Sequence, residues 1–113
     1  MELLTPIEKM AINRVIQHLF SVCRDQLVSV ILYGSKARGD FNSDSDIDLL
    51  ILVRDRENID RNKIYDFLLD DDIYFDLNFS LNIYSVSEFQ HLASINAPFA
   101  VNIIREGETL WTN

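Results

Sequence analysis

The sequence predicts a single α/β domain covering residues 1–113, and three observations predict it. A length of 113 residues suits one domain with a small core. Apolar residues recur with helical or strand-like spacing in the order α-β-β-α-β-α-α, without repeats or long linkers. Hydrophobic residues make up 48% and charged residues 25%, which is a globular rather than a disordered balance. Together they indicate one compact layered structure.

The first predicted element is an amphipathic helix over residues 6–24. Thr5 is a favourable N-cap residue, and Pro6 suits the first helical turn. Cys23 is the single cysteine and lies on the apolar stripe of this helix, so we interpret it as a small buried residue rather than a catalytic thiol. The stripe recurs at helical spacing and comprises Ile12, Val15, Ile16, Leu19, Phe20 and Cys23.

Two strands follow, joined by a polar segment. Residues 28–33 are apolar and rich in β-branched side chains, which predicts a buried strand ending at Gly34-Ser35. Residues 36–45 are polar and predict a loop with room for one helical turn. Residues 47–53 form the second apolar run and predict the second strand.

A helix is predicted over residues 58–69, a turn at residues 70–72 and a third strand over residues 73–81. The third strand has a clear period of two, so its odd-numbered and even-numbered side chains point to opposite faces. Phe75, Leu77, Phe79 and Leu81 share the apolar face, and Tyr74, Asp76, Asn78 and Ser80 share the other.

The C-terminal part predicts two short helices. Ser85 or Ser87 can cap a helix running to about Ala93. Residues 98–105 predict another helix, stopped at Gly107. For Leu110-Trp111 two outcomes stay open, a short terminal strand or packing onto the core.

The charge of the chain limits its partners. The net charge is −8, from 18 acidic and 10 basic residues, and such a surface repels a nucleic-acid backbone. A basic protein partner fits better, although acidity also serves solubility alone. The N-terminus lacks the basic and apolar pattern of a signal peptide, and the longest apolar run, residues 49–53, is too short to span a membrane. We therefore expect a cytoplasmic protein.

Asp46 and Asp48 begin the second predicted strand and carry its chemistry. A period of two places both side chains on one face, with Cα atoms roughly 6–7 Å apart. Carboxylates so close repel each other unless a cation lies between them. Oxygen ligands suit Mg²⁺. Asp76 could supply a third oxygen donor if its strand is a neighbour, and three carboxylates can hold two metal ions.

Gly34-Ser35 supplies a second functional feature. A glycine after a buried strand lets the backbone approach a phosphate closely. The Ser35 hydroxyl and nearby N–H groups can donate hydrogen bonds to phosphate oxygens. Lys36 and Arg38 concentrate positive charge at the same place in an acidic chain.

Other interpretations of these residues fit less well. An EF-hand loop starting at Asp44 needs Gly where Leu49 stands and Glu where Asp55 stands. A P-loop needs Lys where Asp40 stands. Asp46 and Asp48 could instead be solvated residues at a strand start, and Asp76 an exposed strand residue. His18 and His91 have no companion that indicates a site.

The string Gly34-Ser35, ten residues and then Asp46-Ile47-Asp48 resembles the signature of the nucleotidyltransferases of the DNA polymerase β superfamily. The fuller pattern is similar to the minimal nucleotidyltransferases of bacteria and archaea, which are often antitoxin partners of helical HEPN-domain proteins. The resemblance extends to Asp76 and to residues 103–107. It implies the nucleotidyltransferase fold, a small mixed β-sheet flanked by helices.

The resemblance also implies an activity. Two Mg²⁺ ions would bind at Asp46, Asp48 and Asp76, and the triphosphate of ATP at Gly34, Ser35 and Arg38, with Lys36 nearby. AMP would pass to a hydroxyl, a tyrosine of a HEPN-type toxin, within a homo- or hetero-oligomer. Two alternatives stay open: a non-catalytic subunit that neutralises its partner by occlusion, and transfer to a small molecule such as an aminoglycoside.

Overall fold

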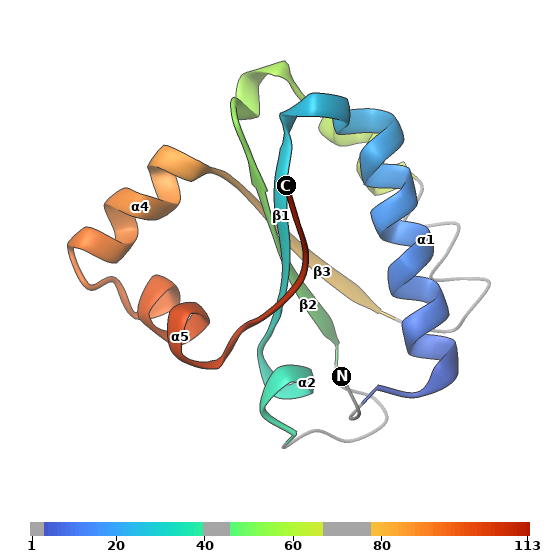
Figure 1. The fold of residues 1–113 in the computed structure, drawn as a ribbon, viewed down its shortest axis with the longest axis horizontal. Helices are drawn as coiled ribbons and strands as arrows, with labels where there is room; N and C mark the ends of the chain where they lie inside the picture. Colours follow the sequence, from blue (N-terminus) through green and yellow to red (C-terminus); the bar gives the residue numbers. More distant parts are fainter. Residues whose placement is uncertain (1–3, 40–45, 67–77) are drawn as a thin grey trace.

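A mixed four-stranded β-sheet organises the protein in the computed structural model, which describes residues 4–39, 46–66 and 78–113. The strands are β1 (Leu27–Tyr33), β2 (Ile47–Val53), β3 (Phe79–Ser85) and β4 (Glu108–Thr112), in the spatial order β3-β2-β1-β4 (Figure 1). β1 is antiparallel to both β2 and β4, whereas β2 and β3 are parallel. The mixed sheet that the family resemblance implied is confirmed.

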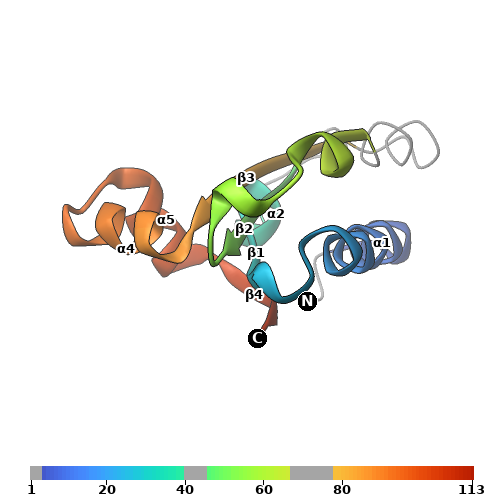
Figure 2. The same ribbon diagram turned by 90° about the horizontal axis from the view of Figure 1, so that it is seen from above.

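Helices cover both faces of this sheet. α1 (Pro6–Cys23) lies on one side, and α4 (Val86–Ser94) and α5 (Pro98–Glu106) lie on the other (Figure 2). The alternation along β2 explains the arrangement, because Leu49 and Ile51 pack in the cluster that contains α1, and Leu50 and Leu52 pack with Ile103 of α5. A strand apolar on both faces therefore sits at the centre of the molecule.

The predicted first helix is confirmed, and its start has a specific cause. Thr5 and Glu8 form a capping box, in which the Glu8 N–H donates to Thr5 Oγ1 at 3.1 Å and the Thr5 N–H donates to Glu8 Oε1 at 2.9 Å. The helix ends at Cys23, and Arg24 follows with a positive φ of 54°. Cys23 is 3% exposed, as its place on the apolar stripe predicts.

The boundaries of two other elements differ from prediction. β3 continues to Ser85 instead of ending at residue 81, because Asn82 donates a hydrogen bond to the Tyr33 hydroxyl within the fold and Ile83 is buried. Residues 73–77 lie outside the described residues, as do the turn at 70–72 and the end of the helix predicted over 58–69. That helix starts later than expected, since residues 56–58 form a 3₁₀ turn and helical residues begin at position 61.

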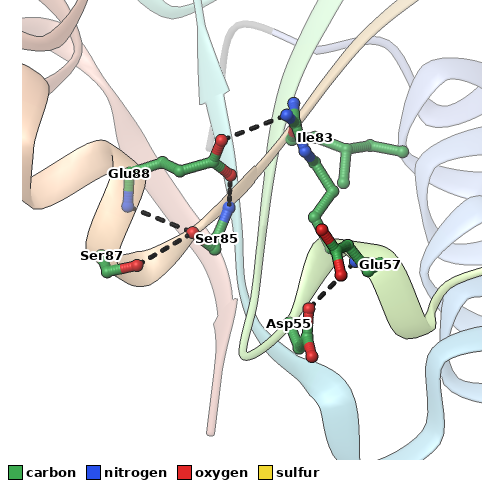
Figure 3. Close-up of polar contacts among 7 residues, drawn as sticks. Asp55, Glu57, Ile83, Ser85, Ser87 and Glu88 are labelled. Atoms are coloured by element: carbon green, nitrogen blue, oxygen red, sulfur yellow. Dashed lines mark hydrogen bonds and ion pairs between the residues drawn. The ribbon is translucent and has the colours of Figure 1, made fainter.

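The C-terminal elements follow the prediction closely. Ser85 caps α4 through a second capping box, in which its hydroxyl accepts from the Glu88 N–H at 3.1 Å (Figure 3). α5 is followed by Gly107. β4 pairs with β1, and Trp111 packs edge-on against Phe20 of α1 at 4.8 Å between ring centroids, so the chain end both forms a strand and covers the core. No helix in the described part of the chain has the length and apolarity that crossing a membrane requires.

Candidate active site

The end of β1 and the start of β2 meet at Gly34. The antiparallel register pairs Tyr33 with Asp48, so the two halves of the sequence motif lie side by side. Gly34 has φ 76° and ψ −156°, a backbone conformation essentially restricted to glycine. A Cβ atom at this position would lie 2.3 Å from Oδ2 of Asp48. Glycine is thus required twice over, by its backbone and by the carboxylate beside it.

A single helical turn, α2 (Ser35–Arg38), follows Gly34 and confirms the prediction of one turn in this segment. The Gly34 carbonyl accepts hydrogen bonds from the N–H groups of Ala37 and Arg38, each at 3.1 Å. Gly39 ends the turn with a left-handed φ of 84°. The first N–H groups of a helical turn have no acceptor within it. Those of Ser35 and Lys36 begin the turn directly after Gly34, which lies beside Asp48.

Asp46 and Asp48 are brought together as the strand period predicts. Asp46 is exposed just before β2, Asp48 is half-buried within it, and the intervening Ile47 is buried on the opposite face. Burial and the charge of Asp46 raise the pKa of Asp48, against smaller lowering effects from a Ser80 hydrogen bond and from Arg38. A bound cation would offset both the burial of Asp48 and its repulsion by Asp46.

A polar strip continues from Asp48 across the sheet. Ser80 of β3 pairs with Asp48 and donates a hydrogen bond to its carboxylate. One period further, Asn82 donates to the hydroxyl of Tyr33. Ser80 and Asn82 were not predicted as site residues, although the alternation that groups Ser80 with Asp76 already indicated this face.

The third predicted carboxylate, Asp76, lies outside the described residues. Within residues 4–39, 46–66 and 78–113, no group of three or more His, Cys, Asp or Glu side chains is arranged to hold a metal ion. Asp46 and Asp48, the two predicted ligands that lie within the described residues, are a pair of oxygen donors of the kind that suits Mg²⁺. A third protein ligand stays a prediction.

Lys36 occupies a different environment from the one its charge suggested. Its Nζ lies 2.6 Å from Oε2 of Glu8 in α1, and the two side chains are only 2% and 6% exposed. Burial raises the pKa of Glu8, but hydrogen bonds from Lys36 and Thr5 outweigh that effect, so the pKa is lowered overall. The Lys36 side chain therefore connects α2 to α1.

Arg38 remains at the surface of the site. Its side chain is 41% exposed and lies 3.5 Å from Glu106 of α5. Its positive charge also acts on Asp48 and offsets a small part of the rise in the pKa of that carboxyl. The guanidinium is therefore accessible to an anion that binds near Gly34, since both residues line the same cavity.

A cavity of about 200 Å³ opens beside Gly34, between β1, α2 and α5. Phe99 and Asn102 of α5, which the sequence had not indicated, contribute to it, as does Glu106 from the stretch 103–107 that resembles the family. The remaining lining residues are Tyr33, Gly34, Arg38 and Ile103. Backbone N–H groups, the carboxylates of Asp46 and Asp48 and a small cavity thus share one end of the sheet.

Comparison with known proteins agrees with this geometry. The family model described as "Nucleotidyltransferase domain" matches residues 12–104. A protein of Methanocaldococcus jannaschii named "Putative protein adenylyltransferase MJ0604" is 32% identical over 106 residues, which cover 92% of this chain and 98% of that protein. A second protein of that organism, "Putative protein adenylyltransferase MJ0141", is 51% identical over 35 residues, 31% of this chain and 35% of that protein.

Solved structures share the fold. A chain from a toxin–antitoxin crystal structure with AMP-PNP superposes with a TM-score of 0.62 at 22% identity, covering 89% of this chain and 73% of that one. The complex of a tri-AMPylated Shewanella oneidensis HEPN toxin with its MNT antitoxin gives a TM-score of 0.57 at 19% identity, covering 93% of this chain and 72% of that one. At such identities, the similarity is one of architecture.

Proposed function

Because the chain belongs to the nucleotidyltransferase family, we propose that it transfers AMP from ATP to a hydroxyl group of a protein and releases pyrophosphate. The observation that carries this proposal is the contact between the Gly34 turn and Asp48. A nucleoside triphosphate needs backbone N–H groups that donate hydrogen bonds to its phosphates and carboxylates that bind its metal counter-ions. The β1–β2 register presents both kinds of group at one place.

The donor's phosphates would lie against the Gly34-Ser35 turn. The absence of a side chain at Gly34 leaves the backbone accessible, and the Ser35 hydroxyl and N–H can donate to phosphate oxygens. Arg38, which is 41% exposed and lines the cavity beside Gly34, would form a charge-assisted bond to a phosphate. Lys36 would act indirectly, by holding α2 against α1 through Glu8.

Asp46 and Asp48, with Asp76, would hold the Mg²⁺ ions of the reaction. When bound, Mg²⁺ would lower the pKa of the attacking hydroxyl and neutralise the leaving pyrophosphate. The hydroxyl oxygen forms a bond to the α-phosphorus, the bond from that phosphorus to the bridging oxygen breaks, and Asp76 accepts the hydroxyl proton. Ser80 would orient Asp48 through its hydrogen bond.

The proposed acceptor is a tyrosine of a HEPN-type protein, which makes this chain an antitoxin. Support comes from the protein adenylyltransferase names of the relatives and from the fold shared with chains of MNT–HEPN complexes. The net charge of −8 suits a basic partner surface. An attached AMP would add bulk and negative charge to an RNA-binding cleft and so block it.

Co-expression with a candidate HEPN partner tests the proposal. Mass spectrometry of the purified partner should show added AMP on tyrosine, and Asp46→Asn should abolish the addition without abolishing the complex. A partner that is neutralised but never modified would refute catalysis and support occlusion. A chain that adenylylates an aminoglycoside, and no protein, would refute the protein acceptor.

A further inference from the structure

We propose that the cavity between α5 and the Gly34 turn binds the purine base of the donor nucleotide. This inference rests on the proposed function, because it assigns the part of ATP that the phosphate and metal residues leave unplaced. The cavity is continuous with the site, since Gly34 and Arg38 line it from one side and α5 lines it from the other.

The size of the cavity fits a base and not a whole nucleotide. Its volume is about 200 Å³. Complete small-molecule sites usually measure roughly 300–1,000 Å³. A planar ring system can enter while the phosphates stay outside, where the N–H groups of α2 and the carboxylates of β2 lie.

Two aromatic rings line the cavity, those of Tyr33 and Phe99, and Tyr84 packs against Phe99 outside it. The centroid of the Phe99 ring lies 5.6 Å from that of Tyr33, at an interplanar angle of 85°, and 5.6 Å from that of Tyr84, at 45°. Ile103, one turn along α5, is 4% exposed and packs with Leu50 and Leu52. Because this helix is anchored in the core, the wall is rigid before a ligand arrives, which favours stacking with a base.

Asn102 and Glu106 supply the polar groups. They are four residues apart on α5 and therefore lie on the same side of the helix. The Asn102 side-chain oxygen accepts from Arg105 at 3.1 Å, which orients the amide, and an asparagine amide can pair with the amino group and ring nitrogen of adenine. Glu106 accepts from amino groups and repels phosphate, so the cavity selects the base end of ATP.

The test compares ligands with and without a base. Calorimetric titration in Mg²⁺ should show that wild-type protein binds ATP more tightly than inorganic tripolyphosphate, and more tightly than purine riboside triphosphate, which lacks the amino group. Asn102→Ala should weaken ATP binding by several-fold to about tenfold and leave tripolyphosphate binding unchanged. Phe99→Ala should act in the same direction, and Asn62→Ala, an exposed amide in the helical residues 61–66, is the matched control.

The outcomes separate this inference from the proposed function. Equal wild-type affinities for ATP and tripolyphosphate would overturn the base pocket while leaving the phosphate site intact. A ratio of ATP affinity to tripolyphosphate affinity that is the same in Asn102→Ala as in the wild type would also overturn it. If Asn102→Ala then lost transfer to the acceptor, the cavity would belong to the acceptor side chain. Failure of the wild type to bind either ligand would overturn both proposals.

Discussion

Breaking the ion pair between Lys36 and Glu8 should destabilise the protein strongly. Lys36→Met removes the ammonium but leaves the Glu8 carboxylate among groups that exclude water, since the two side chains are 2% and 6% exposed. Removing one partner of such a pair costs about 3–5 kcal/mol. For a domain of this size, that loss lowers the melting temperature by about 12–20 °C.

Urea unfolding followed by the fluorescence of Trp111, the single tryptophan, measures this effect. The double variant Glu8→Leu with Lys36→Met should recover most of the lost stability, because replacing both charges with apolar groups removes the desolvation cost. Glu57→Gln, at an exposed position, should change the unfolding free energy by less than about 0.5 kcal/mol. A cost below about 1 kcal/mol for Lys36→Met would refute the reasoning.

The pH dependence supplies an independent check of the same pair. The pKa of Glu8 is lowered in the folded protein, so its stabilisation is present above the ordinary glutamate pKa and is lost as pH falls through the lowered value. In Lys36→Met the carboxyl of Glu8, without its ammonium partner, should instead have a raised pKa. Protonation at low pH should then remove the free-energy cost of burying its charge. The stability difference between wild type and variant should therefore narrow as the pH falls below about 5, and a constant difference would contradict the ion-pair explanation.

Three further predictions concern the site itself. Asp48→Asn should abolish nucleotide transfer in a labelled-ATP assay yet keep or raise metal-free stability, because it removes a charge that burial and Asp46 disfavour; full activity would refute the metal assignment. Gly34→Ala should cost about 1–3 kcal/mol of stability from its backbone alone and should displace Asp48 as well. Both the melting temperature and the rate of nucleotide transfer should therefore fall. Ser35→Ala should weaken ATP binding by about 1 kcal/mol and Arg38→Ala by more, to about 3 kcal/mol; calorimetry showing both unchanged would move the phosphates elsewhere.

Local patterns predicted the elements well because local chemistry determines them. Thr5 and Ser85 both begin helices through capping boxes that are visible in the sequence. The period of two predicted Asp46 and Asp48 as neighbours, and the charge of Asp46 does act on Asp48, whose pKa is raised by burial and by that charge. The end of β3 was predicted at residue 81, but the strand continues to Ser85, and Asn82 bonds to Tyr33, which is 49 residues away. Such a long-range partner cannot be found from the neighbours of a residue.

The distinction between local patterns and long-range partners also separates the site residues that were predicted from those that were missed. The Gly-Ser and Asp-x-Asp residues are close in sequence and were identified together. Lys36 was assigned to the nucleotide on its charge alone, although its ammonium is paired with Glu8, 28 positions earlier. Nothing in the spacing of Phe99, Asn102 and Glu106 distinguishes a cavity wall from an ordinary amphipathic helix. It is tertiary packing, of Ile103 on β2 and of Phe99 on Tyr33, that brings α5 to the site.

Strand order explains why this small sheet can hold a two-part site at all. β2 lies between β1 and β3, so Asp48 has Tyr33 on one side and Ser80 on the other. The antiparallel partner brings the end of β1, and hence the Gly34 turn, to the start of β2. The parallel partner brings the start of β3 to the same edge, where its even-numbered residues share the face of Asp48. If that alternation extends back from Ser80, Asp76 belongs to this face, four residues and two periods away. Asp76→Asn should then abolish transfer as Asp48→Asn does. Asp70→Asn, in the predicted turn, should leave transfer unchanged in the labelled-ATP assay. If Asp76→Asn retained as much transfer activity as Asp70→Asn and the wild type, Asp76 would not belong to the site.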